Sequence, residues 1–335
     1  MPVRVDPSGM SGPTPRNVRS RRWRRTSRGL FVPSSVDGTL PEQRTLEASM
    51  VLPLGGAVTG WAALRWCGSH WFDGLTPDGR RQLPVTLLTG DHNIRSQPGY
   101  VVSEERRPLH ELMVVDGIVV TTHVRSVGNE MRYAANERAA VIAFDMAAYA
   151  DLVSIEEMAA YLATISGWTG VPQARAALPS CDENSWSPRE SAMRRIWEQD
   201  AGLPRPLCNR PIFDRQGNLI GAPDLLDLES GLIGEYDGEL HLVNERRVID
   251  REREGKFRRV GLECVTMVRG DSAHRADIVR LILEARDRAK FESESDRLWT
   301  VEEPPWWTPT YTVAQRRALD SSQRERFLRH RRRAA

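Results

Sequence analysis

The stretch Gly221-Ala-Pro-Asp-Leu-Leu-Asp-Leu-Glu-Ser-Gly-Leu-Ile-Gly-Glu-Tyr-Asp-Gly-Glu-Leu-His241 contains two short apolar runs with a polar turn between them. The apolar runs cover residues 225–228 and 232–234, and the turn covers residues 229–231. Short apolar runs on both sides of a glycine-containing turn predict a β-hairpin. We expect this hairpin to form the centre of the C-terminal half of the chain.

Acidic residues occupy strand positions of this hairpin where a buried strand is normally apolar, namely Asp224, Glu235 and Asp237. Because Glu235 and Asp237 lie two residues apart, their side chains are expected on one face of the strand. Carboxylates brought close together repel each other and lose hydration, and solvent or a hard divalent cation such as Mg²⁺ can balance them. The pattern therefore predicts a metal-dependent site that cleaves phosphodiester bonds.

The length of the hairpin loop decides whether Asp224 joins the other two acids. With a loop of residues 229–232, Asp224 lies opposite Asp237 and the three carboxylates share one face. With a loop of residues 229–231, Asp224 lies opposite Tyr236 and points to the other face, unless a one-residue bulge restores the cluster. The sequence leaves both registers open.

The segments around the hairpin predict an alternation of helices and strands. A helix begins at Ser187-Pro-Arg-Glu190, with Ser187 at the N-cap, Pro188 at the first helical position and Glu190 three residues after the cap. We expect further elements at residues 211–213 (strand), 248–260 (helix), 262–268 (strand) and 276–290 (helix). This order of helix, antiparallel strands, helix, strand and helix predicts a mixed sheet flanked by helices.

The N-terminal half has the pattern of an α+β unit. Strands are expected at residues 83–88, 100–103 and 117–122, and helices at residues 41–52, 59–67, 129–150 and 154–165. The first two helices fit either a helix-turn-helix or an ordinary helical hairpin. The full division is a disordered basic arm (1–28), the α+β unit (29–165), a linker (166–186), the hairpin domain (187–290) and a basic tail containing Pro and Trp (291–335).

Composition excludes a few classes of protein but does not identify the function. The chain has 335 residues, 40% of them hydrophobic, and a formal net charge of only +2. Its four cysteines are far apart, so neither a zinc ribbon nor a disulfide framework is indicated. No apolar run is long enough to cross a bilayer, so we expect a cytoplasmic protein without a membrane partner. Residues 1–30 carry eight arginines and one acid, a charge that fits either a solvated tail or a phosphate backbone.

Residues 187–290 resemble the restriction-endonuclease-like PD-(D/E)xK superfamily, and within it the very-short-patch-repair-like domains of unknown function. The matching motifs are Ser187-Pro-Arg-Glu190, Pro223-Asp224, Glu235-Tyr-Asp-Gly238 followed by His241, and the charged helix from Asp250 with the strand after it. Residues 30–165 are similar to the AbiEi-type antitoxin unit that often precedes such domains. The resemblance implies an α+β unit followed by an α/β restriction-endonuclease-like domain.

The resemblance assigns roles to individual residues. Asp224 and Glu235 would be the central ligands of Mg²⁺ or Mn²⁺, and Glu190 would be an outer ligand. Asp237 stands where most of the superfamily carries lysine, so the cation expected there is missing. His241 could take that catalytic role as a general acid or base, because its ordinary pKa lies near neutrality.

The charged helix after the hairpin offers basic residues for nucleic acid, namely Arg251, Arg253 and Lys256, and these could also supply the missing positive charge. We expect a divalent-metal-dependent DNA endonuclease or nickase. The alternative is a non-catalytic, DNA-binding regulator of antitoxin type that reuses the nuclease fold. A third interpretation is a module that binds a toxin or DNA-repair protein through the tryptophan-rich tail.

Simpler interpretations stand beside these roles. Glu190 fits a capping box without any ligand role, and Asp237-Gly238 fits a turn. His241 fits an exposed loop. The arginines and glutamates of the charged helix fit a salt-bridged surface.

Overall fold

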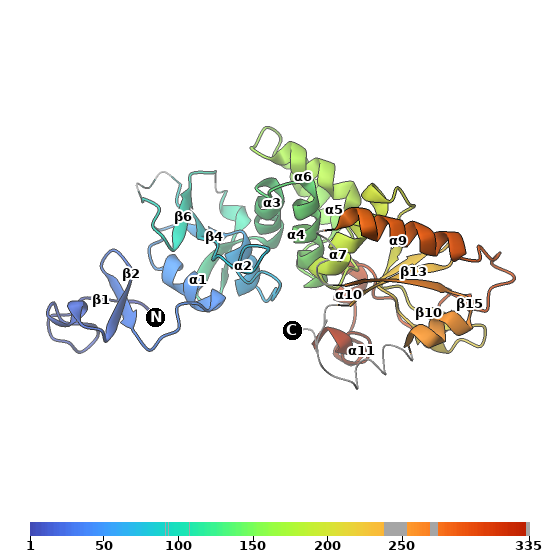
Figure 1. Cartoon of the computed structure of the whole chain (residues 1–335). Coiled ribbons are helices and arrows are strands. Elements are labelled where there is room, and N and C mark those ends of the chain that lie inside the picture. Colours follow the sequence, from blue (N-terminus) through green and yellow to red (C-terminus); the bar gives the residue numbers. More distant parts are fainter. Residues whose placement is uncertain (91, 93, 107, 238–252, 269–273, 333–335) are drawn as a thin grey trace. The chain divides into compact units, whose positions relative to one another are not determined.

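We describe the protein from a computed structural model, which covers residues 1–90, 92, 94–106, 108–237, 253–268 and 274–332 (Figure 1). The chain divides into two compact units. Unit 1 comprises residues 1–134 and 156–175, and unit 2 comprises residues 135–155 and 176–335. The described chain is a mixed α/β protein with mixed sheets flanked by helices, as the sequence predicted at that level.

Unit 1 begins with a small antiparallel sheet in the order β1-β3-β2. Its elements are β1 (Val3–Arg4), a 3₁₀ helix (Asn17–Arg19), β2 (Trp23–Ser27) and β3 (Leu30–Pro33). The expected disordered arm of residues 1–28 therefore carries two strands instead. The buried side chains of residues 30–32 give the arm an apolar strand to pair with, and Arg24 of β2 forms an ion pair with Glu47 at 2.6 Å.

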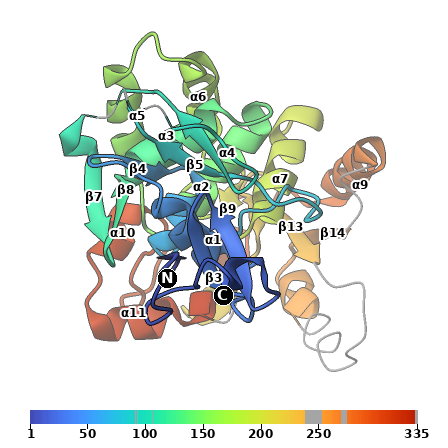
Figure 2. The same ribbon diagram turned by 90° about the vertical axis from the view of Figure 1, so that its left-hand side faces the viewer.

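The larger sheet of unit 1 has five strands in the order β6-β5-β4-β8-β7 (Figure 2). The strands are β4 (Ala57–Thr59), β5 (Val85–Leu88), β6 (Tyr100–Ser103), β7 (Leu112–Val115) and β8 (Ile118–Thr121). Its helices are α1 (Pro41–Ser49), α2 (Trp61–Trp66), a 3₁₀ helix (Leu109–Glu111), α3 (His123–Arg132) and α5 (Ile155–Thr164). Because β4 lies between α1 and α2 in the chain, these helices form neither a helix-turn-helix nor a simple hairpin.

The expected single helix of residues 129–150 is two helices, α3 and α4 (Glu137–Tyr149). Asn136 starts α4 as its N-cap, because its side chain accepts a hydrogen bond from the amide of Ala139 at 3.0 Å. This break also moves the unit boundary, since α4 belongs to unit 2. The segment expected as a linker, residues 166–186, contains α6 (Val171–Ala177) and a 3₁₀ helix (Leu178–Ser180).

Unit 2 is built on a four-stranded mixed sheet in the order β14-β13-β12-β9. Its strands are β9 (Leu207–Cys208), β12 (Leu225–Asp227), β13 (Leu232–Asp237) and β14 (Glu263–Val268). Strand β12 is antiparallel to both β9 and β13, whereas β13 and β14 are parallel. The helices α7 (Pro188–Arg195), continued by a π-helix (Ile196–Asp200), and α9 (Arg275–Arg288) belong to the same unit. The helix of residues 253–259 leads into β14.

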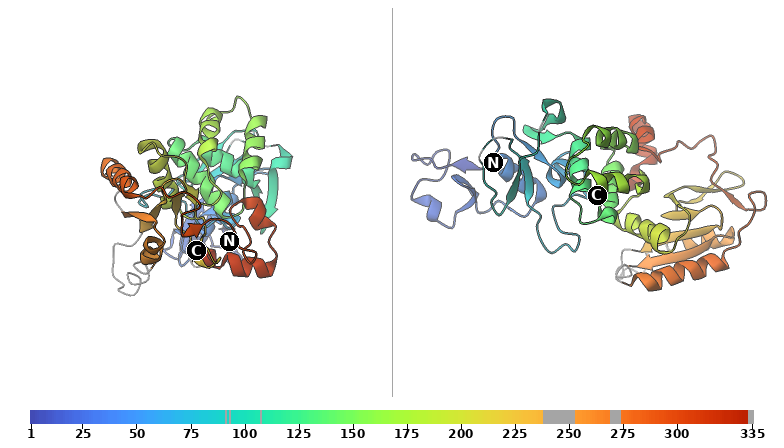
Figure 3. Two further views of the ribbon diagram at one scale, coloured as in Figure 1. Left: turned by 90° about the vertical axis from the view of Figure 1, so that its right-hand side faces the viewer. Right: turned by 90° about the horizontal axis from the view of Figure 1, so that it is seen from above.

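Successive residues of a strand point to opposite faces of the sheet, so the apolar side chains form one cluster on each face. On one face, Leu225 and Leu232 pack in a cluster with Trp197, next to α7, and with Ile282 of α9. The right-hand view of Figure 3 shows α9 (orange) running along the sheet. On the other face, Leu226 and Ile233 pack in a cluster with Phe257, Cys264 and Trp299. The second face therefore lies under the helix of residues 253–259, and strand alternation places Glu235 and Asp237 of β13 on this face together with Ile233.

The tail is folded rather than a loose basic segment. It contributes β15 (Trp299–Thr300) to a sheet ordered β11-β10-β15, with β10 (Ile212–Asp214) and β11 (Leu219–Gly221). It then forms α10 (Val313–Arg317), α11 (Ser321–Phe327) and a 3₁₀ helix (Arg329–Arg332). The buried guanidinium of Arg316 donates to Asp151 at 2.6 Å, so an arginine of the predicted basic tail holds that tail in place.

Candidate functional site

The register of the β12–β13 hairpin differs from both registers considered above. Asp227 pairs with Leu232, and Leu225 pairs with Gly234. Continued by one residue, this register places Asp224 opposite Glu235 rather than opposite Asp237 or Tyr236. The hairpin thus brings the first two predicted metal ligands to directly opposed positions.

Side chains within the turn explain this register. Asp227 accepts hydrogen bonds from the Ser230 hydroxyl at 2.7 Å and from the Glu229 amide at 3.0 Å. Gly231 closes the turn through a bond from its amide to the Asp227 carbonyl, with a φ of 73° that favours glycine. The loop therefore begins at residue 228, one residue earlier than the apolar run indicated.

Asp224 is held at the point where β12 meets β13. Its Oδ2 accepts a hydrogen bond from the amide of Tyr236 at 2.7 Å. Desolvation raises the pKa of the Asp224 carboxyl, and this effect outweighs the Tyr236 hydrogen bond and the nearby charge of Arg253, which both lower it. Asp224 is therefore a proton-binding carboxyl in a poorly hydrated position.

Glu190 approaches from α7. Ser187 caps this helix by accepting a bond from the Glu190 amide at 3.2 Å, as the sequence predicted. The Glu190 side chain does not complete a capping box, because its Oε2 accepts bonds from the Trp186 amide at 2.8 Å and from Asn209 Nδ2 at 2.7 Å. Burial, followed by the charge of Asp224, raises the pKa of Glu190. The two carboxyl groups are thus close enough to influence each other's ionisation.

Arg253 supplies positive charge at the same place. Its guanidinium lies 3.2 Å from Glu235 Oε1 and also donates to the carbonyl of Ala222. Arg253 comes from the helix after the hairpin, which we expected to contribute a cation in place of the missing lysine. Lys256 on the same helix is exposed.

Of the three remaining predicted residues, the structure describes Asp237 alone. Asp237 is exposed at the end of β13, on the strand face shared with Glu235. His241 and Arg251 lie outside the described residues. In the described part of the chain, no three His, Cys, Asp or Glu side chains are grouped so as to hold a metal ion. The carboxylate oxygens of Asp224 and Glu190 are still the hard donors that Mg²⁺ and Mn²⁺ prefer.

Asn209 is a residue of the site that the sequence did not reveal. It follows β9 with a φ of 46°, a conformation that asparagine adopts more readily than most residues. Its backbone amide donates to the Asp224 carbonyl at 3.0 Å, and its side chain donates to Glu190. Asn209 therefore connects the two carboxyl-bearing segments. A left-handed asparagine beside a two-residue strand has no distinctive sequence pattern, so only the structure locates it.

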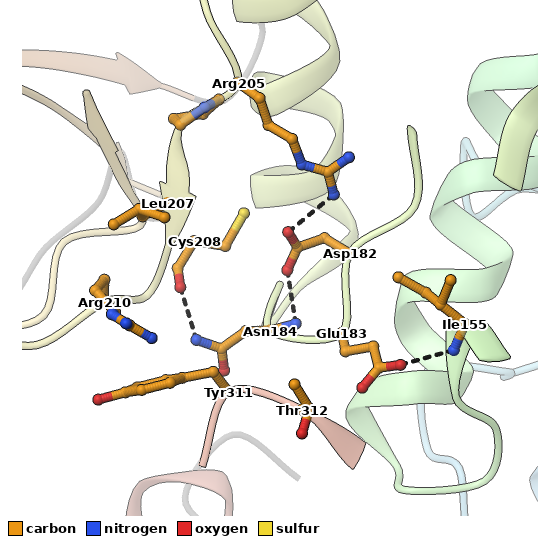
Figure 4. A pocket seen from close by; sticks show the side chains of 11 residues that line it. Ile155, Asp182, Glu183, Asn184, Arg205, Leu207, Cys208, Arg210, Tyr311 and Thr312 are labelled. Carbon is orange, nitrogen blue, oxygen red and sulfur yellow. Dashed lines mark hydrogen bonds and ion pairs between the residues drawn. The ribbon is translucent and has the colours of Figure 1, made fainter. Parts of the chain in front are cut away.

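A pocket of about 350 Å³ is lined by the chain neighbours of Asn209, Cys208 and Arg210, among other residues (Figure 4). One wall is Asn184, whose Nδ2 donates to the carbonyl of Cys208 at 2.6 Å. Arg210 and Tyr311 also line the pocket, and the guanidinium of Arg210 stacks at 3.8 Å from the centre of the Tyr311 ring. Because Asn184 also accepts a bond from Asn209 Nδ2 at 2.8 Å, the pocket wall fixes the orientation of the Asn209 amide.

In the described residues, no helix is both long and apolar enough to cross a membrane. No protein-family model matches the chain, and the searches of curated proteins and of solved structures also gave no match.

Proposed function

We propose that unit 2 is a divalent-metal-dependent DNA endonuclease or nickase. The observation that carries this proposal is the convergence of Glu190 and Asp224 on Asn209, which donates to the Glu190 carboxyl through its side chain and to the Asp224 carbonyl through its backbone amide. The pKa values of both carboxyl groups are also raised, because the groups are poorly hydrated. Perturbed carboxyl groups of this kind concentrate at functional sites. A divalent cation would relieve their repulsion, and Mg²⁺ held by carboxylates supports phosphodiester hydrolysis.

Each side chain has a role under this proposal. Asp224 and Glu190 would hold Mg²⁺ or Mn²⁺, which supplies charge neutralisation at the phosphate oxygens. Glu235 would contribute from the opposite strand, where Arg253 already balances its charge. Arg253 would also provide the positive charge that Asp237 cannot provide, and Lys256 would contact the DNA backbone.

The test is nicking of supercoiled plasmid by the full chain in Mg²⁺. Asp224→Ala and Glu235→Ala should each abolish metal-dependent nicking. Glu229→Ala is the matched control, because Glu229 lies in the same hairpin but its side chain is 67% exposed. Absence of nicking by the unmodified protein, or nicking unchanged in both variants, would refute the proposal.

A second candidate is the non-catalytic, DNA-binding regulator of antitoxin type. The ion pair between Arg253 and Glu235 favours it, because the pair balances one carboxylate without a metal. This candidate predicts binding of DNA in EDTA, weakening steeply with salt, and no cleavage in Mg²⁺. A gel-shift series that shows no binding at low salt would eliminate it. A toxin or DNA-repair protein bound through the tryptophan-rich tail is a separate candidate partner and would be sought by co-purification.

A further inference from the structure

The side-chain oxygen of Asn209 is buried and has no partner of its own. Asn209 is 2% exposed, and its Oδ1 forms no hydrogen bond with the described protein atoms. A buried amide oxygen without a partner is costly, so such an atom calls for an explanation.

The orientation of the Asn209 amide is fixed by its neighbours. Its Nδ2 donates to two acceptors, Glu190 Oε2 at 2.7 Å and the carbonyl of Asn184 at 2.8 Å. A flipped amide would place Oδ1 against the Asn184 carbonyl, where two acceptors would repel each other. The unpartnered atom is therefore the oxygen.

That oxygen lies beside the carboxyl pair. Oδ1 and Nδ2 share one amide carbon, so covalent geometry keeps Oδ1 within roughly 5 Å of Glu190 Oε2. The backbone amide of Asn209 donates to the backbone carbonyl of Asp224 at 3.0 Å, so Asn209 lies next to the residue that carries the second carboxyl group. A neutral oxygen donor thus accompanies two acidic ones that come from separate elements.

We propose that Asn209 Oδ1 is a third oxygen ligand of the divalent cation bound by Asp224 and Glu190. This inference rests on the proposed metal-dependent function and assigns a residue to that site. A cation would satisfy the buried oxygen and offset the repulsion of the carboxylates together. Because all three donors are oxygens, the site would take Mg²⁺, Mn²⁺ or Ca²⁺ rather than a softer metal.

The test is Mn²⁺ binding by the full chain, measured by isothermal titration and by the electron paramagnetic resonance signal of free Mn²⁺. Asn209→Ala should weaken binding at least about tenfold, the lower end of losses seen around metal sites. Asn209→Asp retains an oxygen at this position, so its affinity should equal or exceed that of the unmodified protein. Asn218→Ala, which removes an exposed asparagine, should leave the affinity unchanged.

Asn209→Asp also separates a ligand from a purely structural residue. The new carboxylate loses the donor to Asn184 and Glu190, so the metal-free variant should melt at a lower temperature. Mn²⁺ should then raise its melting temperature more than it raises that of the unmodified protein. If Asn209→Asp binds Mn²⁺ as weakly as Asn209→Ala, the amide donor is what matters and the inference is overturned.

The remaining outcomes separate this inference from the proposed function. If Asp224→Asn abolishes Mn²⁺ binding while Asn209→Ala does not, the metal site stands and the ligand role of Asn209 is refuted. If the unmodified protein binds no Mn²⁺, or Asp224→Asn binds it equally well, the proposed metal site itself is refuted. If circular dichroism shows that Asn209→Ala does not fold, the Mn²⁺ affinity of Asn209→Asp relative to the unmodified protein decides whether Asn209 is a ligand.

Discussion

Asp224 Oδ2 accepts a 2.7 Å hydrogen bond from the amide of Tyr236 on the neighbouring strand. This bond holds one oxygen of the carboxylate at the β12–β13 junction and thereby fixes the direction of the whole group. The same junction receives Glu190 from α7 through the Asn209 bridge. The hairpin, α7 and the residue that follows β9 therefore converge on one poorly hydrated site, although they are separate in sequence.

Glu190→Gln should change how stability depends on pH. The folded state raises the pKa of Glu190 above its ordinary value of 4.5, so it retains a proton that the unfolded chain has released. The free energy of unfolding should therefore fall as the pH rises from that ordinary value through the raised one. Glutamine carries no such proton. Urea unfolding in EDTA at pH 5, 7 and 9 should show that the free energy of unfolding falls less with pH in Glu190→Gln than in the unmodified protein. The same fall in both proteins would contradict a raised Glu190 pKa.

Divalent cations should stabilise the folded protein through Asp224. A ligand that binds only the folded state, present at one hundred times its dissociation constant, adds about 2.7 kcal/mol to the free energy of unfolding. Mg²⁺ should therefore raise the melting temperature of the unmodified protein and of Glu229→Ala at neutral pH. Asp224→Asn should not respond. An equal rise in all three proteins would mean that the ion acts elsewhere.

Asp145→Ala should strongly destabilise unit 2. Asp145 of α4 and Arg194 of α7 form an ion pair at 2.7 Å with both side chains fully buried. Removing one partner leaves a buried charge without compensation, at a cost of about 3–5 kcal/mol. Asp200→Ala is the control, because Asp200 pairs with Arg138 near the surface and its loss should cost about 0–1 kcal/mol. Similar urea midpoints for both variants would contradict this account.

Arg316→Ala should release the folded tail. Arg316 is buried and donates to Asp151 and to the carbonyl of Ala148, at 2.6 Å and 2.7 Å. Without these bonds, trypsin should cleave within residues 310–332 at least about tenfold faster, a change equivalent to about 1.4 kcal/mol. Arg326→Ala, an exposed position on α11, should leave cleavage of the rest of the tail slow. Equal cleavage rates in both variants would show that Arg316 does not hold the tail.

The sequence predicted the position of the hairpin but not its register. The apolar runs and Gly231 indicated two strands and a turn, and the structure confirms them. The register depends on the hydrogen bonds of Asp227 with Ser230 and Glu229, which the pattern of apolar residues does not contain. Hence the register, and with it the hydrogen bond from Tyr236 to Asp224, emerged only from the structure.

Contacts between distant residues explain the other differences. Ser187 and Pro188 predicted the start of α7 correctly, because an N-cap bonds to residues within the first turn of its own helix. Arg316 lies in the segment predicted as a basic tail, and its partner Asp151 lies 165 residues away in sequence, so no local pattern reveals that it is buried. The sequence did not predict Asn209 as a site residue for the same reason, since its partners come from other segments of the chain.

The central claim is that Asp224 and Glu190 bind a divalent cation, and anomalous scattering from crystals soaked in Mn²⁺ tests it most directly. The account predicts a single strong peak within about 2.5 Å of an oxygen of each carboxyl group. A peak only at other positions, or no peak at saturating Mn²⁺ with both carboxyl groups clearly visible, would contradict it.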